Sequence, residues 1–146
     1  MKQLIVGIIL CVSVTGAFAH DEGHGPKLSD VAKQGGIVSS VVEAKDAKLG
    51  EKAPLVHKGE LVRNDDGTVR LYLYDAKMNP LKLEGFEKTA KAILTARKAK
   101  TASFALKIEG DAFVGTAPKP AKKPFNIDIT LKEGSRNLLV AFDNLD

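Results

Sequence analysis

The stretch LVHKGELVRNDDGTVRLYLYDAKMNPL, residues 55–81, contains the clearest structural pattern of the chain. Apolar and polar residues alternate over 69–74, as they do in a strand with one buried face. The preceding segment 64–67, Asn-Asp-Asp-Gly, tolerates positive φ and can reverse the chain, so the stretch predicts a β-hairpin. Residues 75–80 then predict a second turn that ends in Asn-Pro. The hairpin also carries His57, one of three histidines.

The same alternation recurs on both sides of this hairpin. It predicts further strands over residues 37–43, 101–109, 111–116, 125–132 and 137–142. Segment 87–100 fits both a helical face and a strand, and the short strands around it favour a strand. The whole pattern predicts an all-β domain over residues 35–146. We expect an antiparallel, immunoglobulin-like β-sandwich of seven or eight short strands rather than a closed barrel.

Residues 1–19 have the features of a secretory signal peptide. A basic residue precedes an apolar run over 4–14, and Ala17-Phe18-Ala19 forms a small-residue cleavage site. A lipoprotein anchored through Cys11 is disfavoured, because a large leucine precedes that cysteine. We therefore expect cleavage after Ala19, export to a bacterial periplasm and loss of the only cysteine.

Composition excludes several classes of function. The formal net charge is +4, and the basic residues are scattered rather than gathered beside aromatic residues, so no nucleic-acid partner is expected. No later segment is apolar enough to span a membrane, so no span is expected after signal cleavage. The chain has no Gly-rich phosphate loop, no G-x-S-x-G elbow and no H-E-x-x-H pair. The sequence therefore predicts a protein that is not an enzyme.

Metal binding is the most specific hypothesis that the residues suggest. Residues 20–34 predict a flexible tail that contains His20 and His24. After cleavage, the free amine and ring Nδ1 of His20 together suit Cu(II), and Zn(II) is the other candidate ion. His24 can add a ligand from the tail, and His57 offers an imidazole fixed on a strand. The competing interpretation is that these histidines are solvated or take part in ordinary packing.

Residues 35–81, about a third of the chain, resemble a small exported β module. The resemblance rests on Gly35-Gly36 before a strand, on 57–61 (HKGEL), on 69–75 (VRLYLYD) and on 79–81 (NPL). The module is similar to one that accompanies periplasmic adaptor proteins of heavy-metal efflux pumps and copper-resistance proteins. Gln34 stands where that family tends to place a histidine.

The resemblance implies a non-enzymatic periplasmic protein that binds or delivers a transition metal, such as copper, in a heavy-metal efflux or resistance system. Its expected ligands are His20, His24 and His57, and its expected partner is an efflux adaptor or another envelope protein. The alternative is an interaction module of the bacterial envelope that uses no metal.

Overall fold

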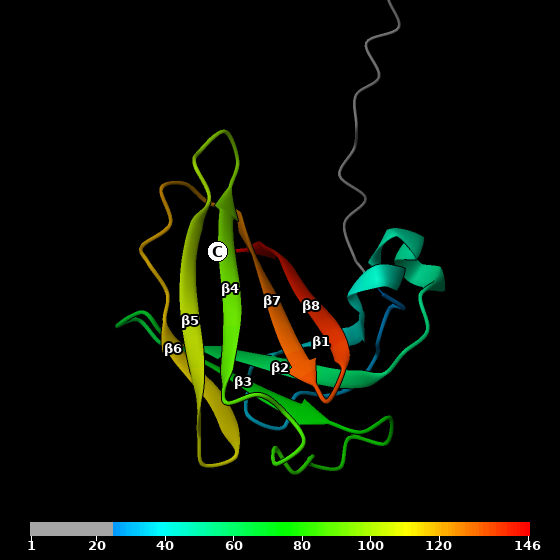
Figure 1. Ribbon diagram of the computed structural model, residues 1–146. Helices are drawn as coiled ribbons and strands as arrows, with labels where there is room; N and C mark the ends of the chain where they lie inside the picture. The colour runs from blue at the N-terminus through cyan, green and yellow to red at the C-terminus, as the bar shows by residue number, and fades with distance from the viewer. Residues whose placement is uncertain (1–24) are drawn as a thin grey trace, which may run out of the picture.

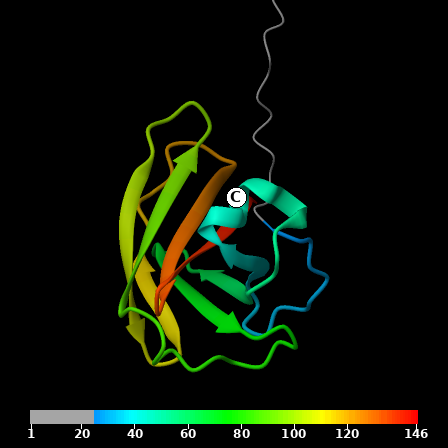
Figure 2. The same ribbon diagram turned by 45° about the vertical axis from the view of Figure 1, so that its right-hand side comes forward.

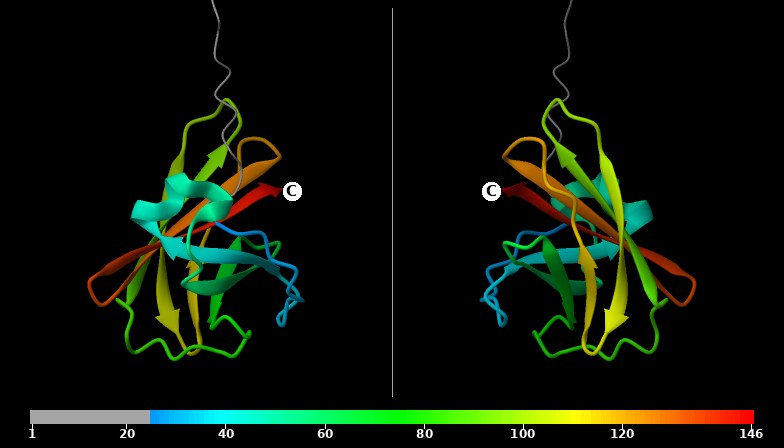
Figure 3. Two further views of the ribbon diagram at one scale, coloured as in Figure 1. Left: turned by 90° about the vertical axis from the view of Figure 1, so that its right-hand side faces the viewer. Right: turned by 90° about the vertical axis from the view of Figure 1, so that its left-hand side faces the viewer.

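The computed structural model describes residues 25–146, and these form a single antiparallel β-barrel beside one short 3₁₀ segment (Figure 1). The eight strands are β1 (Ile37–Glu43), β2 (His57–Arg63), β3 (Thr68–Tyr74), β4 (Thr89–Ala96), β5 (Ala102–Glu109), β6 (Ala112–Thr116), β7 (Phe125–Glu133) and β8 (Arg136–Leu145). The 3₁₀ segment η1 (Ala44–Lys52) follows β1 and lies against β1 and β8 (Figure 3). The prediction of an all-β antiparallel fold is confirmed.

The strands follow one another around the barrel in the order β1-β2-β3-β6-β5-β4-β7-β8. The sheet closes where β1 pairs with β8, with Val41 opposite Val140. A closed barrel therefore forms in place of the expected immunoglobulin-like sandwich of two sheets. Alternation with a period of two tells which residues face inward in either architecture, but it does not tell whether the first and last strands pair.

Strand β4 settles the ambiguity of segment 87–100. Ala90, Ala92, Leu94 and Ala96 are buried, and the residues between them are exposed or half-buried. The strand prediction is therefore confirmed. Helix propensity was overridden because β4 pairs along its length with both β5 and β7, so its backbone groups are satisfied in the sheet.

The predicted central hairpin is confirmed as β2 and β3. Its turn is held by hydrogen bonds from the Asn64 amide to the Thr68 carbonyl (2.9 Å) and from the Gly67 amide to the Asn64 carbonyl (3.0 Å). The second turn is also present. There, the Asp75 carboxylate accepts hydrogen bonds from the Lys77 and Asn79 amides.

Residues 25–36, here called the N-terminal strap, run along the outside of the barrel beside β1–β3 (Figure 2). The strap includes the described part of the segment predicted as a flexible tail, and it is bound to the barrel at several points. Its last residue, Gly36, lies so close to β2 that a Cβ there would be 2.3 Å from the Leu61 carbonyl oxygen. Only glycine fits this approach without a shift of the backbone.

Candidate functional site

Strand β2 presents a polar side chain at each end of its inward face. Gly59 and Leu61 lie in the middle of this face, and the Cβ position of Gly59 faces Val41, Leu71 and Val140 inside the barrel. Because alternate residues of a strand share a face, His57 and Arg63 also face inward. The two are six residues apart, which is about 20 Å along an extended strand. They therefore mark opposite ends of the barrel.

His57 is paired with a carboxylate from β7. Its Nε2 lies 3.0 and 3.1 Å from the two carboxylate oxygens of Glu133. The two side chains are 14% and 22% exposed, so the pair is partly shielded from water. Arg136 also binds Glu133, across the β7–β8 turn. This end of the barrel thus places one nitrogen and two oxygen atoms that can bind a metal ion beside one another.

The same end is closed by the loop between β3 and β4, residues 75–88. Phe86 is 8% exposed, and its ring centroid lies 6.0 Å from that of His57 and 6.2 Å from that of Phe113. The loop is held in place by hydrogen bonds from the Glu87 amide to the Lys132 carbonyl (2.8 Å) and from the Gly134 amide to the loop's Gly85 (3.1 Å). We call this the plugged end, because the loop covers His57 there. Residues of the loop and of β5, among them Leu83 and Ile108, also line a second cavity at this end, of about 560 Å³.

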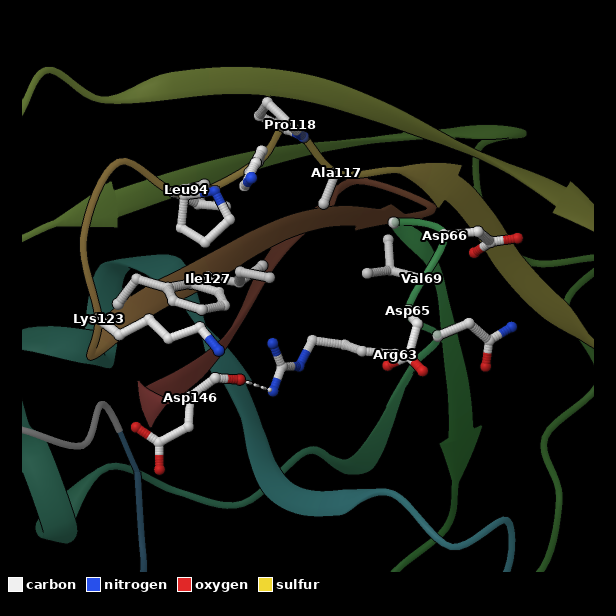
Figure 4. Close-up of a pocket in the computed structure, with 15 residues that line it drawn as sticks. Arg63, Asp65, Asp66, Val69, Leu94, Ala117, Pro118, Lys123, Ile127 and Asp146 are labelled. Carbon is white, nitrogen blue, oxygen red and sulfur yellow. Dashed lines mark hydrogen bonds between the residues drawn. The ribbon is translucent and has the colours of Figure 1, made fainter.

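The opposite end holds a cavity of about 490 Å³, and we call it the open end (Figure 4). The β2–β3 turn, β4, β7 and the loop 117–124 line it. Arg63 reaches into it, with its guanidinium carbon 5.1 Å from the centroid of the Phe125 ring. The Nη2 atom of Arg63 donates a hydrogen bond to the main-chain oxygen of Asp146 at 2.9 Å.

The outer face of β2 carries two buried charged residues, Lys58 and Glu60. The Glu60 carboxylate accepts hydrogen bonds from the amides of Lys33 (2.9 Å), Gln34 (2.7 Å) and Gly36 (2.9 Å) in the strap. It also accepts one from the Tyr74 hydroxyl at 3.0 Å. These bonds attach the strap to the barrel.

Two further contacts hold the same strap. Lys58 pairs with Asp30 at 2.7 Å, and the Ser40 hydroxyl donates to the Pro26 carbonyl. The strap is therefore held by the outward side chains of β1 and β2, while the inward face of β2 serves the barrel ends.

The pKa values of Glu60 and Tyr74 reflect their mutual hydrogen bond. Burial opposes ionisation of Glu60, but the hydrogen bonds from the strap amides and from Tyr74 outweigh it, and the pKa of Glu60 is lowered. Burial and the neighbouring carboxylate raise the pKa of Tyr74 to about 12. A charged Glu60 beside a neutral Tyr74 is therefore the stable arrangement over the neutral pH range.

Of the three predicted ligands, His57 is described, whereas His20 and His24 lie outside the described residues, as does the predicted signal peptide. Within residues 25–146, no group of three or more His, Cys, Asp or Glu side chains is placed to hold a metal ion. The structure adds Glu133 beside His57, which the sequence did not indicate because the two are 76 residues apart.

The chain matches no protein-family model, no curated protein and no solved structure. In the part of the chain that the structure describes, no helix is long and apolar enough to cross a membrane.

Proposed function

We propose that this chain is a non-enzymatic periplasmic protein that binds a transition metal, with His57 and Glu133 as its fixed ligands and His20 and His24 as capture ligands. The observation that carries this proposal is the pairing of the His57 imidazole with the Glu133 carboxylate at 3.0 Å. Imidazole and carboxylate are both common ligands of Zn(II), and imidazole also suits Cu(II).

The separation of the two side chains is close to that needed for a shared ion. Zinc–nitrogen and zinc–oxygen bonds are both about 2.1 Å long, so two ligands at the tetrahedral angle lie roughly 3.4 Å apart. Nε2 of His57 lies 3.1 Å from Glu133 Oε1, and a small outward shift would admit an ion between these two atoms, while Arg136 binds the other oxygen, Oε2. A bound ion would replace their hydrogen bond, and Glu133 would keep Arg136 as a second partner that orients it.

The described chain begins close to this pair, directly after His24 in the sequence. The Cβ position of Gly25 would be 2.7 Å from the Ser40 Oγ, so the residue after His24 is fixed on β1. Ser40 lies opposite Lys58, the neighbour of His57. Five residues, 20–24, span at most about 17 Å when extended, which is enough to pass one strand and reach the plugged end.

We further propose a role in metal delivery or resistance, which rests on the resemblance to heavy-metal efflux modules inferred from residues 35–81 alone. The partner would then be an efflux adaptor or another envelope protein that accepts the ion. No step in this role requires catalysis by the chain itself.

The test is a titration of the processed protein, beginning at His20, with Cu(II) and with Zn(II). We expect sub-micromolar binding that weakens at least about tenfold in His57→Ala and Glu133→Gln, because the loss of one ligand removes a metal–ligand bond. His20→Ala, His24→Ala and a form with extra residues before His20 should weaken Cu(II) binding.

Glu87→Gln provides the matched control, because Glu87 lies near the same end but pairs with Lys132 in a largely exposed position. It should leave the affinity unchanged. If the wild-type protein shows no sub-micromolar binding of either ion, the metal proposal is wrong.

A second candidate function, a metal-independent interaction module, is favoured by one observation. Val31, Ile37 and Leu49 are the large hydrophobic residues that stand exposed in the described chain, with 85%, 49% and 47% of their surface accessible. All three lie between residues 31 and 49, in the strap, β1 and η1. Replacement of all three by Ser should abolish capture of an envelope partner and leave metal binding unchanged.

A further inference from the structure

The open end of the barrel combines cationic side chains with an apolar floor. Val69, Leu94, Phe125 and Ile127 line the cavity from inside the barrel, and each is nearly buried. Arg63, Lys119 and Lys123 line it from the rim. A volume of about 490 Å³ falls within the range of small-molecule sites, which is roughly 300–1,000 Å³.

Two of the cations converge in this cavity. The guanidinium of Arg63 and the amine of Lys123 point toward one another across it, with the main-chain oxygen of Asp146 between them (Figure 4). Neither Arg63 nor Lys123 forms an ion pair among the described residues. The hydrogen bond to Asp146 uses one of the five N–H donors of the Arg63 guanidinium.

Three acidic side chains line the cavity, those of Asp65, Asp66 and Asp146, and in the described chain none of them forms an ion pair with Arg63 or Lys123. The Asp66 carboxylate accepts a hydrogen bond from the Thr68 amide at 2.8 Å, and it points away from the cavity centre (Figure 4). This hydrogen bond lowers the pKa of Asp66, so the charged Asp66 carboxylate stabilises the β2–β3 turn.

We infer that the open end binds a small organic carboxylate with an apolar body. The carboxylate accepts hydrogen bonds from Arg63 in the fork geometry that guanidinium groups favour, and Lys123 adds a second positive charge. The apolar body lies over Phe125, Leu94 and Ile127 at the barrel mouth. This site lies at the opposite end from His57 and Glu133, so it does not depend on the proposed metal site.

The test uses octanoate as the probe, titrated into the full chain and followed by calorimetry and by amide chemical shifts. We expect saturable binding with a Kd below about 1 mM and shifts that cluster on residues 63–69 and 117–127. Octan-1-ol, octylamine and inorganic phosphate serve as comparison probes that lack the charge, reverse it, or lack the apolar body.

Arg63→Gln and Lys123→Gln should each weaken octanoate binding by about tenfold, because each removes a charge-assisted hydrogen bond. Lys123 lies on an exposed loop, so its variant keeps the test valid if Arg63→Gln affects folding. Ala117→Phe, which fills the cavity, should abolish binding. Lys91→Gln, on the exposed face of β4, is the matched control and should change nothing.

Three results would overturn the inference. The first is the absence of saturable octanoate binding below about 1 mM. The second is equal affinity for octan-1-ol or for phosphate. Equal affinity for octan-1-ol would mean that the carboxylate is not recognised, and equal affinity for phosphate would mean that the apolar body is not. The third is octanoate binding that Arg63→Gln and Lys123→Gln both leave unchanged.

Discussion

The two ends of the barrel are built from the same strands but finish differently. Strands β2 and β7 run the full length of the wall, so β2 contributes His57 to one end and Arg63 to the other. Likewise, β7 contributes Glu133 to the plugged end and Phe125 to the open end. At the plugged end the polar groups pair with each other, whereas at the open end they face a cavity.

The loops explain this difference. Loop 75–88 contains Met78, Leu83 and Phe86, all buried, and so can fill the space between the strand ends. Loop 117–124 reads APKPAKKP and has no large apolar side chain to insert. Its prolines also lack the amide donors that a returning strand would need. Both ends have a cavity, but loop 75–88 covers the polar pair at its end, whereas Arg63 and Lys123 line the cavity at the other. Loop composition, rather than the strands, therefore decides which polar side chains are accessible from a cavity.

Removal of the plug is expected to have the largest effect. Phe86→Ala should lower the free energy of unfolding by about 3–4 kcal/mol, because it removes a buried aromatic ring and leaves a cavity beside His57 and Phe113. Urea denaturation followed by circular dichroism measures this loss. Phe104→Ala, at a half-buried position on β5, should cost less. A loss below about 1 kcal/mol for Phe86→Ala would mean that the two ends are equally open.

The second prediction concerns the strap, which covers the strand that serves both ends. Glu60→Gln should cost about 2 kcal/mol, because a neutral amide accepts the strap amides more weakly than a buried carboxylate does. Hydrogen exchange should then speed up in residues 33–36 and at both ends of β2. Glu109→Gln, at an exposed position, is the control. Faster exchange at one end alone would show that the strap supports the two ends unequally.

The same contact predicts a pH window for stability. The pKa of Glu60 is lower in the folded chain, so its contribution is complete above the ordinary value of 4.5 and is lost as the pH falls further. The pKa of Tyr74 is raised from 10.0 to about 12, so its contribution is complete below pH 10 and is lost as the pH rises toward 12. Thermal unfolding between pH 3 and 11 should show this plateau. Tyr74→Phe should flatten the alkaline limb, whereas Glu60→Gln should flatten the acid limb and also weaken the alkaline one, because the Glu60 carboxylate helps to raise the pKa of Tyr74.

Much of the wall could be predicted from local pattern alone. The alternation over 69–74 correctly placed Val69, Leu71 and Leu73 inside, because strand periodicity is a property of neighbouring residues. Closure of the barrel and the partner of His57 could not be predicted in this way. Each depends on pairing between residues far apart in the chain, such as Val41 with Val140 and His57 with Glu133.

The candidate sites show the same limit. Tyr74 alternates like an outward-facing residue, yet it is 2% exposed because the strap covers it. Glu60 and Lys58 read as solvated charges, since nothing nearby in the sequence indicates that amides from residues 33–36 and the Asp30 carboxylate meet them. The pattern H-x-G-x-L-x-R over β2 is the one local signal of polar residues on an inward face, and it appears once the strand is recognised.

The interaction between His57 and Glu133 at the plugged end should contribute about 0.5–1 kcal/mol to the free energy of unfolding. A double-mutant cycle with His57→Gln and Glu133→Gln measures this coupling, which is modest because both side chains keep some contact with water. The cycle should be run without metal and then with Zn(II) present. The coupling should rise with the ion if the two side chains share it. Coupling energies of zero under both conditions would mean that the buried side chains and backbone hydrogen bonds of loop 75–88, rather than this pair, hold the plugged end.

The smallest effect is expected for Arg63→Gln at the open end, about 0.5 kcal/mol without ligand. The variant loses one hydrogen bond to the Asp146 main chain and a half-exposed contact with the Phe125 ring. Both contacts are weak in the presence of water. Lys91→Gln is again the control, and urea denaturation is the measurement. An inward-facing arginine that adds so little stability would be consistent with a role in binding. A loss above about 2 kcal/mol would instead mean that Arg63 stabilises the barrel, as the polar pair and Phe86 do at the plugged end. The polar side chains would then be structural at both ends.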